Sequence, residues 1–177
     1  MTKYITLLRG INVGGNKKVP MAKLKQMLEK MGFTKVKTLL ASGNVVFEAA
    51  ETDAGALARK IGQTFEATFG FTSFIILRTT AEIAALIESD PFKGITVTPA
   101  TRLYVTFLTE KPLSKLRIPY VSPEGNCSII RVSPSEVCSV LTVTDGTRSV
   151  DAMAILEKTF GKNVTTRNWN TVLKLVG

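Results

Sequence analysis

The sequence predicts an α+β protein built from two ferredoxin-like lobes, each with a mostly antiparallel sheet and helices on one face. Three observations lead to this prediction. Between residues 3 and 78, apolar residues follow strand and helix periodicities in the order βαββαβ. Much of that order recurs after residue 100. The chain has 177 residues, of which 45% are hydrophobic, and this is sufficient for a sizeable buried core.

The first lobe is expected to span residues 1–94 and to begin with a β-rich apolar run at residues 3–9. A glycine-rich loop then leads into a helix, because apolar residues recur at helical spacing from Met21 to Met31. Pro20 suits the first turn of this helix, and Gly32 suits its end.

A hairpin and a second helix continue the lobe. The segments 36–41 and 45–47 flank Ser42-Gly43-Asn44, a composition typical of a hairpin turn. Residues 53–69 carry an apolar stripe that predicts a helix, and residues 73–78 are expected to form the closing strand.

A linking helix is expected next. Thr79 and Glu82 have the spacing of a capping box, in which the two side chains bond to each other's main-chain N–H groups. The pair Asp90-Pro91 is expected to end that helix, because the residue before a proline disfavours helical geometry.

The second lobe is expected to span residues 95–177 and to repeat the pattern in part. Its expected elements are a strand at 103–108, a short helical or irregular piece around 113–116, a hairpin of 129–132 with 137–143, a helix at 150–160 and a strand at 164–166. Asn168 is then expected to cap a short C-terminal helix with Trp169, Val172, Leu173 and Val176 on one side.

The positive charge is concentrated near the N-terminus. The net charge is +9, and the first 50 residues hold nine Lys or Arg and two Glu. A positive potential on one lobe favours anionic partners such as nucleotides, phosphometabolites or nucleic acid. Lysine-rich helix faces also occur purely as solvated surface, so charge alone does not choose between these interpretations.

The composition removes several kinds of chemistry. The chain contains no histidine, which excludes Ser-His-Asp and Cys-His nucleophilic sites and imidazole metal ligands. Its two cysteines, Cys127 and Cys138, fall on different rungs of the expected hairpin, so buried reduced thiols are expected rather than a disulfide. We therefore expect no metal site and no cofactor, while the sequence leaves open whether the protein is an enzyme.

The opening loop, residues 9–21, is the first candidate site. Its candidate ligand-binding residues are Arg9, Gly10, Asn12, Gly14, Gly15, Lys17 and Lys18. The loop is not a Walker loop, because the Gly-Lys-Ser/Thr sequence that would hold a nucleotide and magnesium does not follow its glycines. Glycines still allow main-chain N–H groups to approach an anion, beside the N-terminus of the following helix. The alternative is that the glycines serve only a tight turn and that Arg9 pairs with a carboxylate.

A second candidate site consists of Arg167, Asn168, Trp169 and Asn170, which combine planar hydrogen-bonding groups with the single tryptophan. The alternative for Trp169 is an anchor that fixes the C-terminal helix to the core. If this segment met the opening loop, both would line one polar cleft. That juxtaposition is a hypothesis based on the residue types alone.

Three separated motifs resemble those of a known bacterial family, the domain of unknown function 1697. They are Leu7-Leu8-Arg9-Gly10-Ile11-Asn12-Val13-Gly14-Gly15, Ser42-Gly43-Asn44-Val45-Val46-Phe47 and Thr165-Thr166-Arg167-Asn168-Trp169-Asn170-Thr171-Val172. The resemblance runs from end to end. It implies a two-lobed α+β cytoplasmic protein and supplies no catalytic residues.

We therefore predict a small anionic or phosphorylated ligand at the opening loop. One alternative is a single-stranded nucleic-acid-binding module that uses the basic N-terminal lobe, although residues 103–108 match only the shorter signature of an RRM domain. Another alternative is an oligomerising or partner-binding module. The sequence has neither a signal-peptide core nor an apolar run of about 18 residues, so we expect a cytoplasmic protein without a membrane partner.

Overall fold

The computed structural model describes residues 1–15, 17–50, 53–112, 116–144 and 149–177. It is a mixed α+β structure with two antiparallel sheets, which confirms the predicted fold class. The chain forms two compact units. The N-terminal unit comprises Met1–Ala85 and Lys174–Gly177, and the C-terminal unit comprises Leu86–Leu173.

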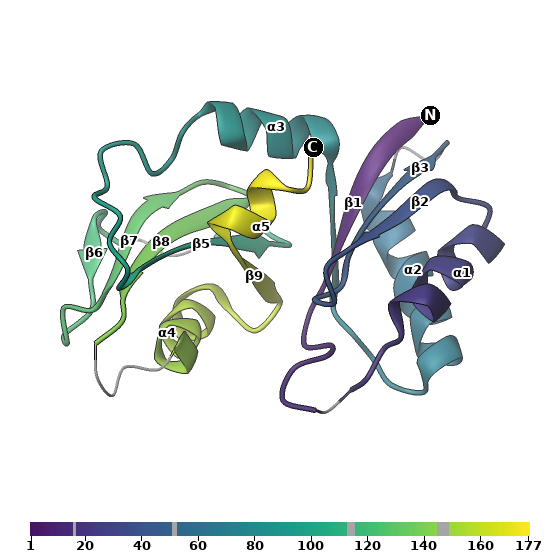
Figure 1. Ribbon diagram of the computed structural model, residues 1–177, viewed down its shortest axis with the longest axis horizontal. Helices are drawn as coiled ribbons and strands as arrows, with labels where there is room; N and C mark the ends of the chain where they lie inside the picture. Colours follow the sequence, from purple (N-terminus) through teal and green to yellow (C-terminus); the bar gives the residue numbers. More distant parts are fainter. Residues whose placement is uncertain (16, 51–52, 113–115, 145–148) are drawn as a thin grey trace. The chain divides into compact units, whose positions relative to one another are not determined.

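The N-terminal unit has a four-stranded sheet in the order β2-β3-β1-β4, with antiparallel neighbours throughout. Its strands are β1 (Thr2–Leu8), β2 (Thr34–Leu39), β3 (Asn44–Ala49) and β4 (Ile75–Thr79). Helices α1 (Met21–Lys30) and α2 (Ala54–Phe69) cover one face of the sheet (Figure 1). The central position of β1 and β3 is the ferredoxin-like arrangement that the sequence predicted.

The core of this unit lies between the sheet and its two helices. Tyr4 on β1 pairs with Phe47 on β3, and both side chains are buried in one cluster with Leu24 of α1 and Ile61 of α2. The rings of Phe33 and Phe47 stack with their centroids 4.6 Å apart. These contacts confirm the apolar stripes predicted for both helices.

Side-chain caps fix the starts of two helices. Asp53 Oδ1 accepts a 2.9 Å hydrogen bond from the N–H of Ala56, which caps α2. At α3 (Thr80–Glu88), the N–H of Thr79 donates to Glu82 Oε2 and the N–H of Glu82 donates to Thr79 Oγ1. The predicted capping box is therefore confirmed.

The C-terminal unit has a five-stranded antiparallel sheet in the order β6-β7-β8-β5-β9. Its elements are β5 (Thr101–Leu108), β6 (Tyr120–Val121), β7 (Cys127–Val132), β8 (Glu136–Thr142), α4 (Ser149–Phe160), β9 (Val164–Asn168) and α5 (Trp169–Leu173). The order β7-β8-β5-β9 repeats that of the N-terminal sheet, and β6 is an edge strand that the sequence did not predict. Of the piece expected around 113–116, residues 113–115 lie outside the described part of the chain.

The core of the C-terminal unit includes Leu108, Val137 and Leu156, the last from α4. The predicted cap of α5 is confirmed, because Asn168 Oδ1 accepts a 2.9 Å hydrogen bond from the N–H of Asn170. The expected apolar side of the C-terminal helix is wrong at two positions. Leu173 is 42% exposed, and Val176 lies beyond the helix, because α5 ends at Leu173.

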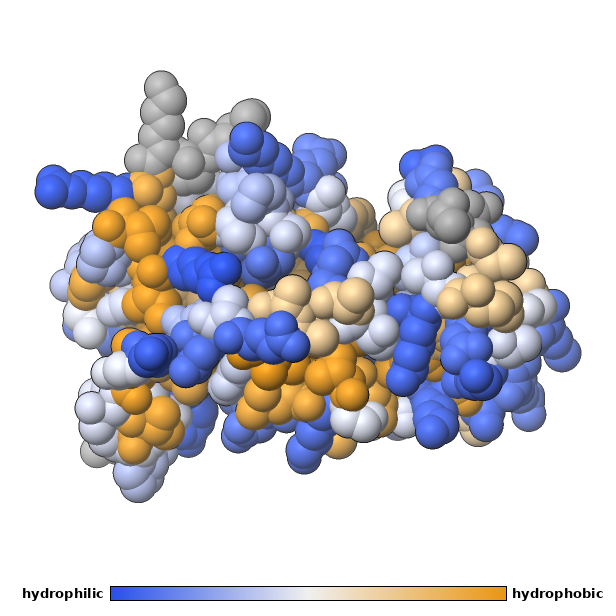
Figure 2. Space-filling model, turned by 90° about the horizontal axis from the view of Figure 1, so that it is seen from above, coloured by the Kyte–Doolittle hydropathy of each residue, from blue (hydrophilic) through white to orange (hydrophobic). Residues whose placement is uncertain are grey.

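Exposed large hydrophobic side chains occur at scattered sequence positions. In the described part of the chain they are Met1, Val13, Leu40, Val97, Val121 and Leu173. Figure 2 shows hydrophobic residues lying among hydrophilic ones on the face that is seen from above. Single exposed apolar residues are ordinary on protein surfaces and by themselves indicate no interface. Among the helices of the described residues, none has the length and apolar character needed to span a bilayer.

Candidate functional site

Hydrogen bonds on both sides hold the base of the opening loop in the N-terminal unit. The N–H of Leu8 donates to the carbonyl oxygen of Gly43 at 3.0 Å, and the N–H of Arg9 donates to that of Phe74 at 2.9 Å. Ser73 Oγ donates to the carbonyl oxygen of Arg9 at 2.9 Å. The loop therefore starts from a point fixed by the segment just before β4 on one side and by the β2–β3 turn on the other.

Asn12 holds the rest of the loop. Its main-chain N–H donates to the carbonyl oxygen of Lys17 at 3.2 Å, which closes the tip. Its side-chain Nδ2 donates to the carbonyl oxygens of Val19 and Ala41 at 3.0 and 2.8 Å, and its Oδ1 accepts from the N–H of Val19 at 2.8 Å. Because both N–H donors of this amide are occupied, the role that the geometry favours for Asn12 is to position the loop.

The three glycines of the loop have left-handed backbone geometry, with φ of 68° at Gly10, 61° at Gly14 and 77° at Gly15. A Cβ atom built at any of them would meet no other heavy atom within 4 Å. These glycines therefore provide positive φ at exposed positions, and tight packing does not explain them.

Gly43, in the second motif, has a different role. Its φ is 79°, and a Cβ atom there would lie 2.8 Å from Ile11 Cδ1 and 2.9 Å from Leu8 Cβ. The β2–β3 turn therefore packs directly against the start of the opening loop. The sequence predicted this turn but gave no sign of the close approach, which depends on the position of Ile11 in the folded unit.

The cations of the loop lie around its tip and at its base. Lys17 and Lys18 are exposed, and Arg9 is half-buried. Lys17 has φ of 49°, and its Nζ lies 5.7 Å from the centre of the Phe71 ring. Helix α1 starts after the loop with Pro20 at its N-cap, no side-chain capping bond and no acidic residue in its first turn. Its positive dipole end is therefore not neutralised by its own first turn.

The second candidate segment lies in the C-terminal unit, and its arginine is buried. Arg167 is 9% exposed, and its Nη1 donates to Thr165 Oγ1 at 2.8 Å and to the carbonyl oxygen of Thr166 at 3.0 Å. Burial lowers the pKa of the Arg167 guanidinium to about 10, so it remains charged near neutral pH. These bonds give Arg167 a structural role within β9.

The other members of this segment point in different directions. Side chains alternate along a strand, so Arg167 and Asn168 leave β9 on opposite faces. Asn168 caps α5, and the Trp169 ring meets the Phe92 ring edge-on with centroids 5.1 Å apart. Asn170 is exposed. The opening loop and this segment belong to different units, and their joining in one site stays a prediction.

The two cysteines are buried, and burial disfavours the reactive thiolate form of each. Cys127 and Cys138 are buried free thiols. Burial raises the pKa of both, to about 12 for Cys138, so the thiolate form is disfavoured. Among the described residues, no cluster of three or more Cys, Asp or Glu side chains could hold a metal ion.

A basic pocket on the N-terminal sheet was not predicted from the sequence. It has a volume of about 260 Å³, and the side chains that line it include Lys3, Lys35, Lys37 and Glu48. Their positions in the sequence are spread over three strands, so only the sheet register brings them together. The one signal in the sequence was the excess of lysine in the first 50 residues.

Comparisons with known proteins identify a family and a solved structure with a similar fold. The model described as "Protein of unknown function (DUF1697)" matches residues 1–126. Among solved structures, the chain is similar to conserved bacterial protein SP0830 from Streptococcus pneumoniae, with a TM-score of 0.74 and 24% identity over 99% of this chain and 97% of that chain. No curated protein matches the chain. At this identity, the likeness to the solved structure shows the fold alone.

Proposed function

We propose that this chain, which belongs to the DUF1697 family of proteins of unknown function, binds a small anionic ligand at the opening loop. One observation carries the proposal. Gly14 and Gly15 are exposed residues of left-handed geometry with open space around them, and the exposed cations Lys17 and Lys18 follow them. Exposed N–H groups next to positive charge are the arrangement that recognises phosphate and other oxyanions.

Each residue of the loop has a distinct part in this proposal. The N–H groups of Gly14 and Gly15 donate to the anion, and Lys17 and Lys18 supply charge. Asn12 holds the loop in shape, because its amide already bonds to Val19 and Ala41. A preformed loop loses less conformational entropy when a ligand binds, which raises affinity.

Arg9 and Gly10 complete the site at the base of the loop. The main chain of Arg9 is fixed by Phe74 and Ser73, so its guanidinium starts from a defined point and adds positive charge. Gly10 provides the left-handed turn that leads from β1 into the loop. The N-terminus of α1, at the other end of the loop, adds its dipole.

The nucleic-acid alternative has weaker support from the sheet. RRM-type modules stack bases on aromatic side chains of their central strands. Tyr4 and Phe47, the aromatic residues of β1 and β3, are buried in the core beneath the helices and do not offer such a platform. This alternative therefore depends on charge alone, and salt dependence distinguishes it from a defined anion site.

Calorimetric titration with pyrophosphate tests the proposal. We expect wild-type protein to bind pyrophosphate, and a Lys17→Gln/Lys18→Gln variant to bind it about tenfold more weakly. The matched control is Lys25→Gln/Lys30→Gln, which removes the same charge from exposed positions of α1 in the same unit. Equal weakening in both variants would show that only the overall charge matters, and would contradict a site at the loop.

A parallel titration with a labelled single-stranded oligonucleotide distinguishes the nucleic-acid alternative from the proposed anion site. Binding of the oligonucleotide that falls steeply with salt, without measurable binding of pyrophosphate, would favour the nucleic-acid module over the small-ligand site.

A further inference from the structure

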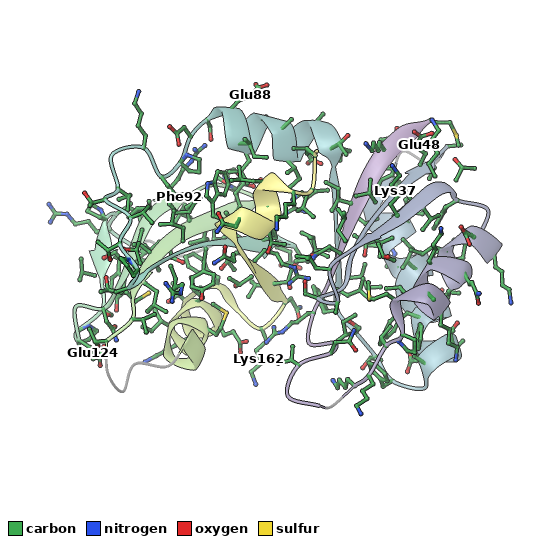
Figure 3. The ribbon with its side chains drawn as sticks, in the orientation of Figure 1. Lys37, Glu48, Glu88, Phe92, Glu124 and Lys162 are labelled. Carbon is green, nitrogen blue, oxygen red and sulfur yellow. The ribbon has the colours of Figure 1, made fainter. Side chains whose placement is uncertain are left out.

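The pocket on the N-terminal sheet lies away from α1 and α2. Val45 and Phe47 of β3 point into the core under the helices, so the alternate residues Val46 and Glu48 point to the opposite face. Lys3 of β1 pairs with Glu48, and Lys37 of β2 pairs with Val46, which places both lysines on that same face. Figure 3 labels Lys37 and Glu48 on these adjacent strands.

A β-bulge adds a third lysine. The pairing between β2 and β3 shifts between Thr34 and Lys37, and Lys35 within the bulge has φ of 51°. Its Nζ lies 3.0 Å from Glu48 Oε1, with the Lys35 side chain 72% exposed and that of Glu48 19% exposed. A bulge re-aims side chains at a sheet edge, and here it aims a lysine at the acidic residue of the pocket.

The remaining charge of the pocket is positive. Lys35 and Glu48 neutralise each other, whereas Lys3 and Lys37 form no ion pair with any residue in the described part of the chain. Two cations without a carboxylate partner beside one pocket repel each other, and an anion between them removes that repulsion. A dianionic group such as a phosphate monoester, which carries about −1.5 to −2 at neutral pH, can interact with both lysines at once.

The other side chains that line the pocket are apolar, and Gly177 completes the lining. Leu39 is partly buried, and Val46 and Leu175 are 6% and 2% exposed. The volume of about 260 Å³ is just below the usual range of about 300–1,000 Å³ for ligand sites, and it suits a fragment-sized molecule. An apolar wall beside two unpaired cations matches a ligand with an anionic end and an apolar end.

We infer that this pocket binds a small organic phosphate monoester, whose phosphate lies between Lys3 and Lys37 and whose apolar group contacts Leu39, Val46 and Leu175. Lys35 is paired with Glu48 and lies at the edge of the pocket. The site is separate from the opening loop. Lys3 and Leu8 lie near opposite ends of β1, about 17 Å apart at ~3.3 Å per strand residue.

Phenyl phosphate is the probe that tests this inference, because it joins a phosphate monoester to one apolar ring. We expect calorimetry to show tighter binding of phenyl phosphate than of either inorganic phosphate or phenol. A Lys3→Gln/Lys37→Gln variant should bind phenyl phosphate about 5- to 30-fold more weakly, the loss expected for two partly exposed charge contacts. Both lysines are exposed, so thermal unfolding should confirm an intact fold.

Two further variants distinguish the pocket from other sites. Leu39→Ala should weaken the binding of phenyl phosphate and leave the binding of inorganic phosphate unchanged, because this substitution alters only the apolar wall of the pocket. Lys25→Gln/Lys30→Gln, at exposed positions of α1 away from the pocket, is the charge-matched control and should leave phenyl phosphate binding unchanged. All variants are compared in the Lys17→Gln/Lys18→Gln background, which weakens oxyanion binding at the opening loop.

The outcomes separate this inference from the proposed function. If Lys3→Gln/Lys37→Gln binds phenyl phosphate as tightly as the protein with both lysines intact, or if Lys25→Gln/Lys30→Gln loses as much affinity, the pocket assignment is overturned. Failure of wild-type protein to bind phenyl phosphate overturns it as well. Neither result depends on the pyrophosphate titration that tests the opening loop.

Discussion

Asn12 Nδ2 donates a 2.8 Å hydrogen bond to the carbonyl oxygen of Ala41. This bond joins the opening loop to the β2–β3 turn, and the packing of Gly43 against Ile11 reinforces the connection. Two motifs that are far apart in the sequence therefore form one structural assembly in the N-terminal unit. The shape of the loop depends on the turn as much as on its own residues.

Replacement of Asn12 should destabilise the N-terminal unit. Asn12→Gly removes the side-chain hydrogen bonds to Val19 and Ala41 but tolerates the φ of 55°, and we expect a loss of about 1–3 kcal/mol in the free energy of unfolding. Asn12→Ala should lose about 1 kcal/mol more, because alanine disfavours positive φ. Urea unfolding measures both. Equal stability of Asn12→Gly and wild type would contradict a structural role for the amide.

Two glycine substitutions should differ in cost. Gly14→Ala and Gly43→Ala both place a Cβ atom at positive φ, which costs about 1–2 kcal/mol. Only Gly43→Ala also forces a Cβ atom against Leu8 and Ile11, so we expect about 1–3 kcal/mol of further destabilisation from overpacking. The melting temperatures of the two variants check this prediction, and that of Gly43→Ala should be the lower. If Gly14→Ala is the more harmful, the packing role assigned to Gly43 is wrong.

Local sequence signals predicted much of the fold. Apolar periodicity located α1, α2 and the strands of both sheets other than β6, and the Thr79–Glu82 spacing identified a capping box that forms as expected. Strand β6 was missed, because a two-residue strand carries no periodicity. Leu173 was wrongly assigned to an apolar helix side, because the position where α5 ends is not encoded by spacing.

The candidate site was less predictable. Sequence identified the glycines and lysines of the opening loop, but it could not show that the Asn12 amide is already bonded to the main chain. It also could not group Lys3 with Lys37, because their proximity depends on sheet register and on the bulge at Lys35. Long-range pairing determines both features, and local residue preferences do not contain it.

The thiols should be protected in the folded protein. Burial raises the pKa of Cys127 and raises that of Cys138 to about 12, so at pH 8 little thiolate is present and access is blocked. We expect a thiol-specific chromogenic reagent to label neither cysteine quickly in native buffer and both in urea. Rapid labelling of native protein would contradict their burial.

The raised thiol pKa also gives a pH dependence of stability. The unfolded Cys138 thiol ionises near its ordinary pKa of 9.0, whereas the folded thiol holds its proton to about pH 12. The unfolded state therefore binds fewer protons between these values, and the contribution of Cys138 to stability falls as pH rises from about 9 to 12. Urea unfolding of wild type and Cys138→Ala at pH 8 and pH 10 measures this. The difference between their free energies of unfolding should be smaller at pH 10 than at pH 8.

The central claim is that the main chain of Gly14 and Gly15 binds an anion. Amide chemical shifts of ¹⁵N-labelled protein, titrated with pyrophosphate at constant ionic strength, test it most directly. We predict that the Gly14 and Gly15 amides shift first and saturate together, and that Lys17→Gln/Lys18→Gln moves the midpoint of this response to an about tenfold higher pyrophosphate concentration. Saturating shifts confined to other residues, or no shift at either glycine, would contradict the claim.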